Sequence, residues 1–155
     1  MSSRSVEHAT FAVERTYDAA PKRVFAAWSD PEAKSRWFAG PEGTEEFELD
    51  FRVGGRERNR GGGPDGEMYT YDARYQDIVP DERIVYTYEM YRDETRISVS
   101  VATVELTPEG GGTRLVFTEQ GAFLDGEDKP EYREQGTGSL LDALGAELAK
   151  ERTTA

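Results

Sequence analysis

The sequence contains no cysteine, and His8 is the only histidine among its 155 residues. Without cysteine there are no disulfides, thiol nucleophiles or thiolate metal sites. A single histidine near the amino terminus cannot serve an internal nucleophile triad. Carboxylates are plentiful, but Asp125–Asp128 is too short for a calcium loop. We therefore expect no metal ion and no other cofactor, and we interpret His8 as a surface residue.

Long apolar runs and basic residues are also scarce. No run approaches the length of a membrane-spanning helix, and the first residues lack an apolar signal region, so we expect a cytoplasmic location. Lys and Arg total 19 against 31 Asp and Glu, which gives a net charge of −12. That charge disfavours nucleic acid and anionic membranes as partners, and it is typical of a protein kept soluble by charge.

Aromatic residues, by contrast, are plentiful at 11% of the sequence. Both tryptophans lie within Val24–Phe38, and eight tyrosines follow or precede this stretch. The apolar residues occur in periodic clusters, which argues against disorder. The length predicts one domain, over residues 8–151, with flexible ends at 1–7 and 152–155.

Hydrophobic periodicity predicts mostly strands. Alternation of apolar and polar residues indicates strands at 10–17, 45–53, 56–60, 68–79, 83–90, 97–107 and 113–119. Two short helices are expected on either side of Asp30-Pro31, because the residue before proline avoids the helical region. Residues 121–130 are interpreted as an acidic loop. The last helix is predicted over 131–151, with an apolar stripe made by Leu140, Leu141, Leu144 and Leu148.

This order of elements predicts an α+β fold. A curved antiparallel sheet of six to seven strands must cover its apolar face, and the long C-terminal helix is the amphipathic element available for that. The two short helices after the first strand would close one end. Strands that grip one long helix in this way leave room for a cavity.

Several segments resemble a known family. The run from Arg15 to Phe38 is similar to the opening of the SRPBCC (START-like) superfamily, and more closely to the family related to the C-terminal domain of the activator of heat-shock protein 90 ATPase. Asp50–Gly55, Asp77–Tyr86 and Gly112–Phe117 support the resemblance. It implies a helix-grip fold with a cavity between the sheet and the C-terminal helix. Bacterial members are often small stand-alone proteins described as polyketide-cyclase-like or lipid-transport-like.

One departure concerns the cavity mouth. The last helix in this family often begins with Gly-Trp, whereas here Gly136 is followed by Thr137. The mouth is therefore expected to be wider or more polar.

Apolar side chains are the candidate ligand-binding residues. Aromatic rings offer large apolar faces, and tyrosine adds a hydroxyl that orients a ligand. The alternative for each ring is a filled core. Which residues of Tyr69–Tyr75 point inward is left open, because a bulge in this strand would move every side chain to the opposite face of the sheet. The candidates are Trp37, Phe38, Phe51, Tyr71, Tyr86, Tyr88, Phe117, Phe123, Leu141 and Leu144.

Three functions are compatible with these features. The first is a non-catalytic protein that binds a small hydrophobic or aromatic molecule. The second is a cyclase- or dehydratase-like enzyme on a polyketide-like substrate, with Glu119 as acid–base candidate and Arg74 or Arg15 as its partner. The third, by analogy alone, is a co-chaperone-like ATPase activator.

A homodimer is a further expectation. Ile97, Val99 and Val101 face opposite to Val104 and Leu106 on one predicted strand, so both sheet faces carry apolar groups. A second subunit would cover one of them.

Overall fold

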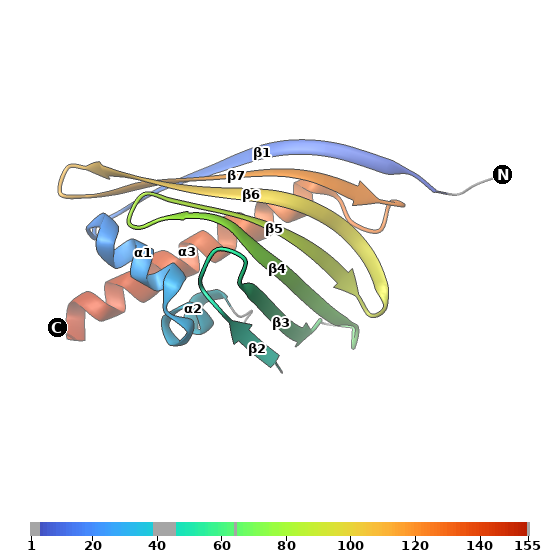
Figure 1. The fold of residues 1–155 in the computed structure, drawn as a ribbon, viewed down its shortest axis with the longest axis horizontal. Coiled ribbons are helices and arrows are strands. Elements are labelled where there is room, and N and C mark those ends of the chain that lie inside the picture. Colours follow the sequence, from blue (N-terminus) through green and yellow to red (C-terminus); the bar gives the residue numbers. More distant parts are fainter. Residues whose placement is uncertain (1–3, 39–45, 64, 155) are drawn as a thin grey trace.

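The computed structural model describes residues 4–38, 46–63 and 65–154 and confirms the predicted α+β class. Seven antiparallel strands form one curved sheet in the order β1-β7-β6-β5-β4-β3-β2, and a long helix runs along its concave side (Figure 1). The elements are β1 (Val6–Tyr17), α1 (Pro21–Ser29), α2 (Pro31–Phe38), β2 (Glu46–Leu49), β3 (Arg56–Gly62), β4 (Met68–Val79), β5 (Arg83–Arg92), β6 (Thr95–Glu109), β7 (Gly112–Leu124) and α3 (Pro130–Thr154).

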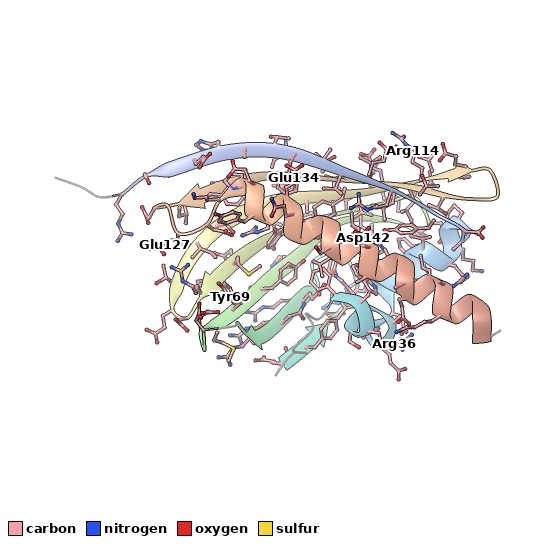
Figure 2. All side chains as sticks on the ribbon, turned by 180° about the vertical axis from the view of Figure 1, so that it is seen from behind. Arg36, Tyr69, Arg114, Glu127, Glu134 and Asp142 are labelled. Carbon is pink, nitrogen blue, oxygen red and sulfur yellow. The ribbon has the colours of Figure 1, made fainter. Side chains whose placement is uncertain are left out.

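Helix α3 crosses the concave face obliquely (Figure 2). Its stripe is buried at Leu141, Leu144 and Leu148. The hydroxyl of Tyr17, at the end of β1, donates a hydrogen bond of 2.7 Å to the Leu141 carbonyl oxygen. The helix is therefore fixed to the sheet by apolar burial and by this buried hydrogen bond. This is the helix-grip arrangement.

Helices α1 and α2 close one end of the layer between sheet and α3 (Figure 1). Pro21 begins α1, where its missing N–H costs nothing. Asp30 follows α1, and its carboxylate accepts a hydrogen bond of 3.1 Å from the Ala33 N–H in the first turn of α2. The rings of Trp28 and Trp37 then meet edge to face, 4.8 Å apart, and join the two helices.

The predicted strand at 45–53 is wrong in its second half. Strand β2 ends at Leu49 and the chain then turns, with Gly54 at a φ of 84°. A Cβ on Gly55 would lie 2.0 Å from the Asp50 carbonyl oxygen, so only glycine fits this turn. Val53 is consequently exposed rather than directed to the core. The alternating pattern continues in the sequence to Val53, past the end of β2 at Leu49 and into the turn that the two glycines complete.

The predicted loop at 121–130 is also wrong at its start. Residues 121–124 belong to β7, which pairs there with β1 on one side and β6 on the other. Phe123 is buried in this segment. The turn begins at Asp125 and Gly126, both with positive φ. Glycine and acidic residues suggested a loop, but pairing on both edges holds the segment extended. Strand β1 correspondingly starts at Val6, earlier than expected.

The bulge suspected in β4 is present, as a register shift between Tyr75 and Asp77. This shift lies after the stretch Tyr69–Tyr75, whose inward face the sequence left open. Tyr71, Ala73 and Tyr75 therefore all face inward and are buried. In the described part of the chain, no helix is both long and apolar enough to cross a membrane.

Candidate functional site: an aromatic cavity

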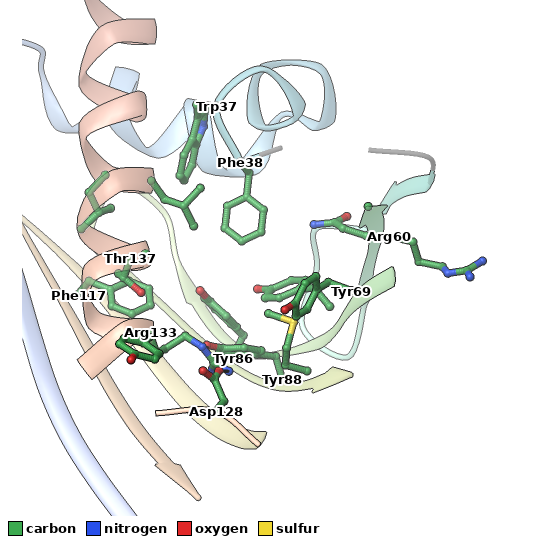
Figure 3. Close-up of a pocket in the computed structure, with 18 of the residues that line it drawn as sticks. Trp37, Phe38, Arg60, Tyr69, Tyr86, Tyr88, Phe117, Asp128, Arg133 and Thr137 are labelled. Carbon is green, nitrogen blue, oxygen red and sulfur yellow. Dashed lines mark hydrogen bonds and ion pairs between the residues drawn. The ribbon is translucent and has the colours of Figure 1, made fainter. Parts of the chain in front are cut away.

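A cavity of about 680 Å³ lies between the inner face of the sheet and α3. Figure 3 shows Tyr86 and Tyr88 on its floor, Trp37 and Phe38 at one end, and Arg133 and Asp128 at the other. Its wall is predominantly aromatic. The aromatic lining residues are Trp28, Trp37, Phe38, Tyr69, Tyr71, Tyr86, Tyr88, Phe117 and Tyr132.

The tyrosine floor follows from the register of β4 and β5. The ring centroids of Tyr71 and Tyr88 lie 4.9 Å apart, with the two rings tilted by 35°. The ring centroids of Tyr88 and Tyr86 lie 5.9 Å apart. Tyr88 pairs across the strands with Ala73, a small inward residue. Tyr71, Tyr86 and Tyr88 all line the cavity, whereas Ala73 is buried in the core.

A buried ion pair lies behind the end of the cavity formed by α2. The ammonium of Lys34 is 2.5 Å from the carboxylate of Glu57 in β3, and both side chains are 0% exposed. The Tyr75 hydroxyl donates to the same carboxylate at 2.6 Å, and the Asn59 amide donates to its other oxygen at 2.8 Å. Lys34 also lies 4.2 Å from the centre of the Phe38 ring. Burial lowers the pKa of Lys34, while the Glu57 charge opposes that shift.

A second polar network is centred on Arg133 of α3. Its guanidinium donates to the Tyr88 hydroxyl at 2.7 Å and to the Glu119 carboxylate at 3.1 Å. Its other terminal nitrogen donates to Ser98 at 2.7 Å and to Asp128 at 2.9 Å. Burial alone lowers the pKa of Arg133, but the neighbouring Tyr88, Glu119 and Asp128 outweigh it and raise the pKa. The guanidinium is therefore a permanent charge held in one orientation.

Glu119 lies beneath this network. Its side chain is fully buried, and it accepts hydrogen bonds from Tyr88 at 2.8 Å, from Ser100 at 2.7 Å and from Arg133. Burial raises the pKa of Tyr88, so the phenol stays protonated and donates to Glu119. Tyr88 reaches the cavity and Glu119 does not contribute to its wall.

Three residues that line the cavity each have a buried polar atom with no hydrogen-bond partner among the described residues. These atoms are the indole nitrogen of Trp28, the side-chain oxygen of Asn59 and the hydroxyl of Tyr71. Asn59 and Tyr71 are more than nine-tenths buried, at 7% and 8% exposed. The Tyr71 hydroxyl approaches Tyr86 without reaching hydrogen-bond geometry. Over the same described residues, no three His, Asp or Glu side chains are grouped to hold a metal ion.

Comparison with known proteins identifies the fold and the family. Residues 18–149 match the family model of the Activator of Hsp90 ATPase homolog 1-like proteins. The chain belongs to this family. No curated protein matches it.

Solved structures of similar proteins support the family assignment. An uncharacterised protein from Rhizobium leguminosarum is 52% identical, with a TM-score of 0.91 over 95% of this chain and 98% of that one. A protein from Rhizobium loti is 52% identical, with a TM-score of 0.87 over 92% and 99%. One from Chromobacterium violaceum is 28% identical, with a TM-score of 0.77 over 88% and 94%.

The sequence candidates divide into two groups in this member of the Activator of Hsp90 ATPase homolog 1-like family. The structure brings seven of the ten together on the cavity wall: Trp37, Phe38, Tyr71, Tyr86, Tyr88, Phe117 and Leu141. Phe51 instead packs behind it, against Phe25 and Tyr75. Phe123 lies under the Arg133 guanidinium, and Leu144 is in the solid core.

The catalytic candidates are not brought together. Arg74 is directed to the Gly54 carbonyl oxygen at 2.9 Å, and Arg15 pairs with Asp142 of α3 at 2.7 Å. Neither contacts Glu119, so the expected pairings are wrong. Charged strand residues usually pair with nearby surface groups, and these two arginines do so.

Sequence reasoning missed the polar residues of the site. Lys34, Glu57, Asn59 and Arg133 were not among its candidates. A signal was present for Glu57 and Asn59, because alternation along 56–60 places both on one face of the strand. No local pattern distinguishes Lys34 or Arg133.

Proposed function

We propose that this protein binds a small hydrophobic, aromatic molecule reversibly in the cavity beneath α3. The cavity itself carries the proposal, since about 680 Å³ lies within the range of roughly 300–1,000 Å³ of small-molecule sites. Its aromatic wall offers large apolar faces, and its few polar groups come from fixed positions on the sheet and helix. A cytoplasmic location fits such a role.

The polar networks support binding rather than catalysis. The Glu119 carboxylate is occupied by Tyr88, Ser100 and Arg133, and Glu57 is occupied by Lys34, Tyr75 and Asn59. A general base needs an oxygen within reach of the substrate proton. Carboxylates that are buried and satisfied in this way act as supports for the wall.

One observation favours the second candidate, a cyclase- or dehydratase-like enzyme. Tyr88 lies on the cavity floor with Glu119 accepting its proton and Arg133 donating to its oxygen. Its single proton is engaged by Glu119, so the hydroxyl would have to turn from Glu119 to a bound carbonyl in order to donate a hydrogen bond there. This candidate requires turnover of a bound polyketide-like molecule that stops in Tyr88→Phe. An ATPase-activator role rests on the family description alone.

The binding proposal is tested with a neutral fluorescent probe, N-phenyl-1-naphthylamine. We expect saturable binding of one probe per chain in the micromolar range. Gly136 lines the cavity at an exposed position, and a Cβ there meets nothing within 4 Å, so Gly136→Phe adds a ring at the cavity mouth. We expect that variant to bind at least about tenfold more weakly, a loss of about 1.4 kcal/mol.

The matched control is Gln135→Phe, which adds the same ring to an exposed position one residue away on α3. It should bind the probe as the unmodified chain does. The proposal fails if the unmodified chain shows no saturable binding, or if the two variants bind equally well.

A further inference from the structure

The unpartnered atoms at the cavity define what a ligand must offer. Asn59 and Tyr71 lie directly opposite each other on β3 and β4. Both line the cavity, and each has one polar atom without a partner among the described residues, as does Trp28 through its indole N–H, which is a further donor. A buried polar atom left unsatisfied costs about 1–3 kcal/mol, so a pair of them on one wall indicates that a ligand completes the set.

The Asn59 amide can be assigned its orientation. Its nitrogen donates to Glu57 at 2.8 Å, and the other carboxylate oxygen of Glu57 is held by Lys34 and Tyr75. A rotation of the amide by 180° would place an acceptor against a carboxylate. The Lys34–Glu57 pair therefore fixes the Asn59 oxygen as an acceptor that needs a donor.

Tyr71 has the complementary requirement. Burial raises the pKa of its hydroxyl well above the usual value, as do the neighbouring Tyr86 and Glu57. The group stays protonated at neutral pH and needs an acceptor. A ligand with a hydroxyl group, or with a donor and an acceptor on one ring system, meets both requirements.

The charges around the cavity disfavour an anion. Lys34 is matched by Glu57, and Arg133 is matched by the carboxylates of Glu119 and Asp128. Both terminal nitrogens of Arg133 already donate to two acceptors each. Arg60 also lines the cavity, but its guanidinium points outward (Figure 3) and lies 3.7 Å from the Glu46 carboxylate. The net charge of −12 adds long-range repulsion of anions.

We propose that the ligand is an uncharged, hydroxylated aromatic molecule whose polar group bonds to Asn59 and Tyr71, and that carboxylates of the same shape are rejected. The inference rests on the proposed function, because it assigns the chemistry of the molecule that the cavity holds. It separates phenol-like ligands from fatty acids and other anionic amphiphiles.

Three biphenyls of similar size test the inference: 4-hydroxybiphenyl, 4-methylbiphenyl and biphenyl-4-carboxylate. The two tryptophans of the sequence both line the cavity, so quenching of their fluorescence reports binding of all three. We expect the hydroxy compound to bind about three- to tenfold more tightly than the methyl compound, as one or two net hydrogen bonds allow. The carboxylate should bind at least about tenfold more weakly than the hydroxy compound.

Tyr71→Phe removes the unpartnered hydroxyl and keeps the ring. We expect it to weaken 4-hydroxybiphenyl about three- to tenfold and to leave 4-methylbiphenyl unchanged. Tyr69→Phe at the partly exposed edge of the cavity is the control and should change neither. Because the Tyr71 hydroxyl has no hydrogen-bond partner among the described residues, Tyr71→Phe breaks no hydrogen bond there, and its thermal stability should not fall.

The outcomes separate the two proposals. If none of the biphenyls binds, the proposed function falls and the ligand chemistry falls with it. If they bind but the carboxylate is preferred, or the hydroxy and methyl compounds bind alike, the inference is overturned while the binding function stands. Identical behaviour of Tyr71→Phe and Tyr69→Phe would likewise overturn the inference and leave the binding function in place.

Discussion

Lys34 and Glu57 form an ion pair with no exposure to solvent, 2.5 Å apart. Removing one partner of such a pair leaves an uncompensated buried charge. We expect Lys34→Met to lower the free energy of unfolding by about 3–5 kcal/mol. The double variant Lys34→Met/Glu57→Gln should be markedly more stable than the single one, because no bare charge remains. Urea denaturation followed by tryptophan fluorescence measures both.

The matched control for that prediction is the exposed pair of Arg83 and Asp77, whose side chains are 50% and 43% exposed. Arg83→Met should cost no more than about 1 kcal/mol. Comparable losses in Lys34→Met and Arg83→Met would contradict a structural role for the buried pair.

Among single residues, the aromatic side chains of the cavity wall could be predicted from the sequence, whereas its polar side chains could not. Tyr86 and Tyr88 alternate on an evident strand, so their shared face follows from period two. Lys34 is buried because it pairs with Glu57, which lies 23 residues away in the sequence. Arg133 is buried because it pairs with Glu119, which lies 14 residues away. A charge is buried only where tertiary structure supplies its counter-charge, and no local pattern contains that information.

Glycines in α3 have different neighbours along the helix. A Cβ on Gly136 meets nothing within 4 Å, whereas one on Gly145 would lie 3.2 Å from the ring of Tyr17. That ring is held by its hydrogen bond to Leu141. Close approach to the sheet therefore explains Gly145, and Gly136 borders the cavity.

These surroundings predict opposite outcomes for one substitution. Gly136→Ala should raise the free energy of unfolding by about 0.5–1 kcal/mol, because alanine is the better helix former. Gly145→Ala should gain nothing or lose stability, since the new methyl group must displace the Tyr17 ring. Thermal unfolding of both variants provides the measurement. Equal gains would show that Tyr17 does not restrict the helix.

Element boundaries were predicted least well where glycines occur. The sequence alternates between apolar and polar residues as far as Val53, but β2 ends at Leu49 and the chain turns at Gly54 and Gly55. Gly121 lies inside β7, where β1 and β6 pair with it on both sides. Glycine permits both a turn and an extended strand, so neighbouring strands decide which one forms.

For the whole molecule, the order of elements was sufficient to predict the architecture. A sheet with one apolar face and a single long amphipathic helix has few ways to bury both, and the chain adopts the expected one. The volume of the cavity was beyond such reasoning. It depends on how far the side chains of the sheet and of α3 fall short of filling the space between them, which is a sum over the tertiary packing.

The outer face of the sheet bears on the proposed homodimer. Val99 and Val101 of β6 point outward and are 41% and 38% exposed, while Ser98, Ser100 and Ala102 point inward. Ile97, predicted on the same outer face, is instead buried at 2% exposed, next to the point where the register of β5 and β6 shifts. Two copies that paired through this face would bury the valines against each other. Each copy, however, carries a charge of −12, which opposes association. The apolar contact and the repulsion therefore respond oppositely to salt.

We expect sedimentation equilibrium to show a dimer fraction that grows as salt rises from about 0.05 M to about 0.5 M, because the Debye length falls and repulsion is screened. Val101→Glu should abolish the dimer at every salt concentration, since it places a like charge in the contact. Val53→Glu alters the charge equally at an exposed valine in the turn between β2 and β3 and should leave the dimer intact apart from the added repulsion. A monomer throughout, or equal effects of the two substitutions, would rule out pairing through β6, and the exposed valines would then be isolated surface residues.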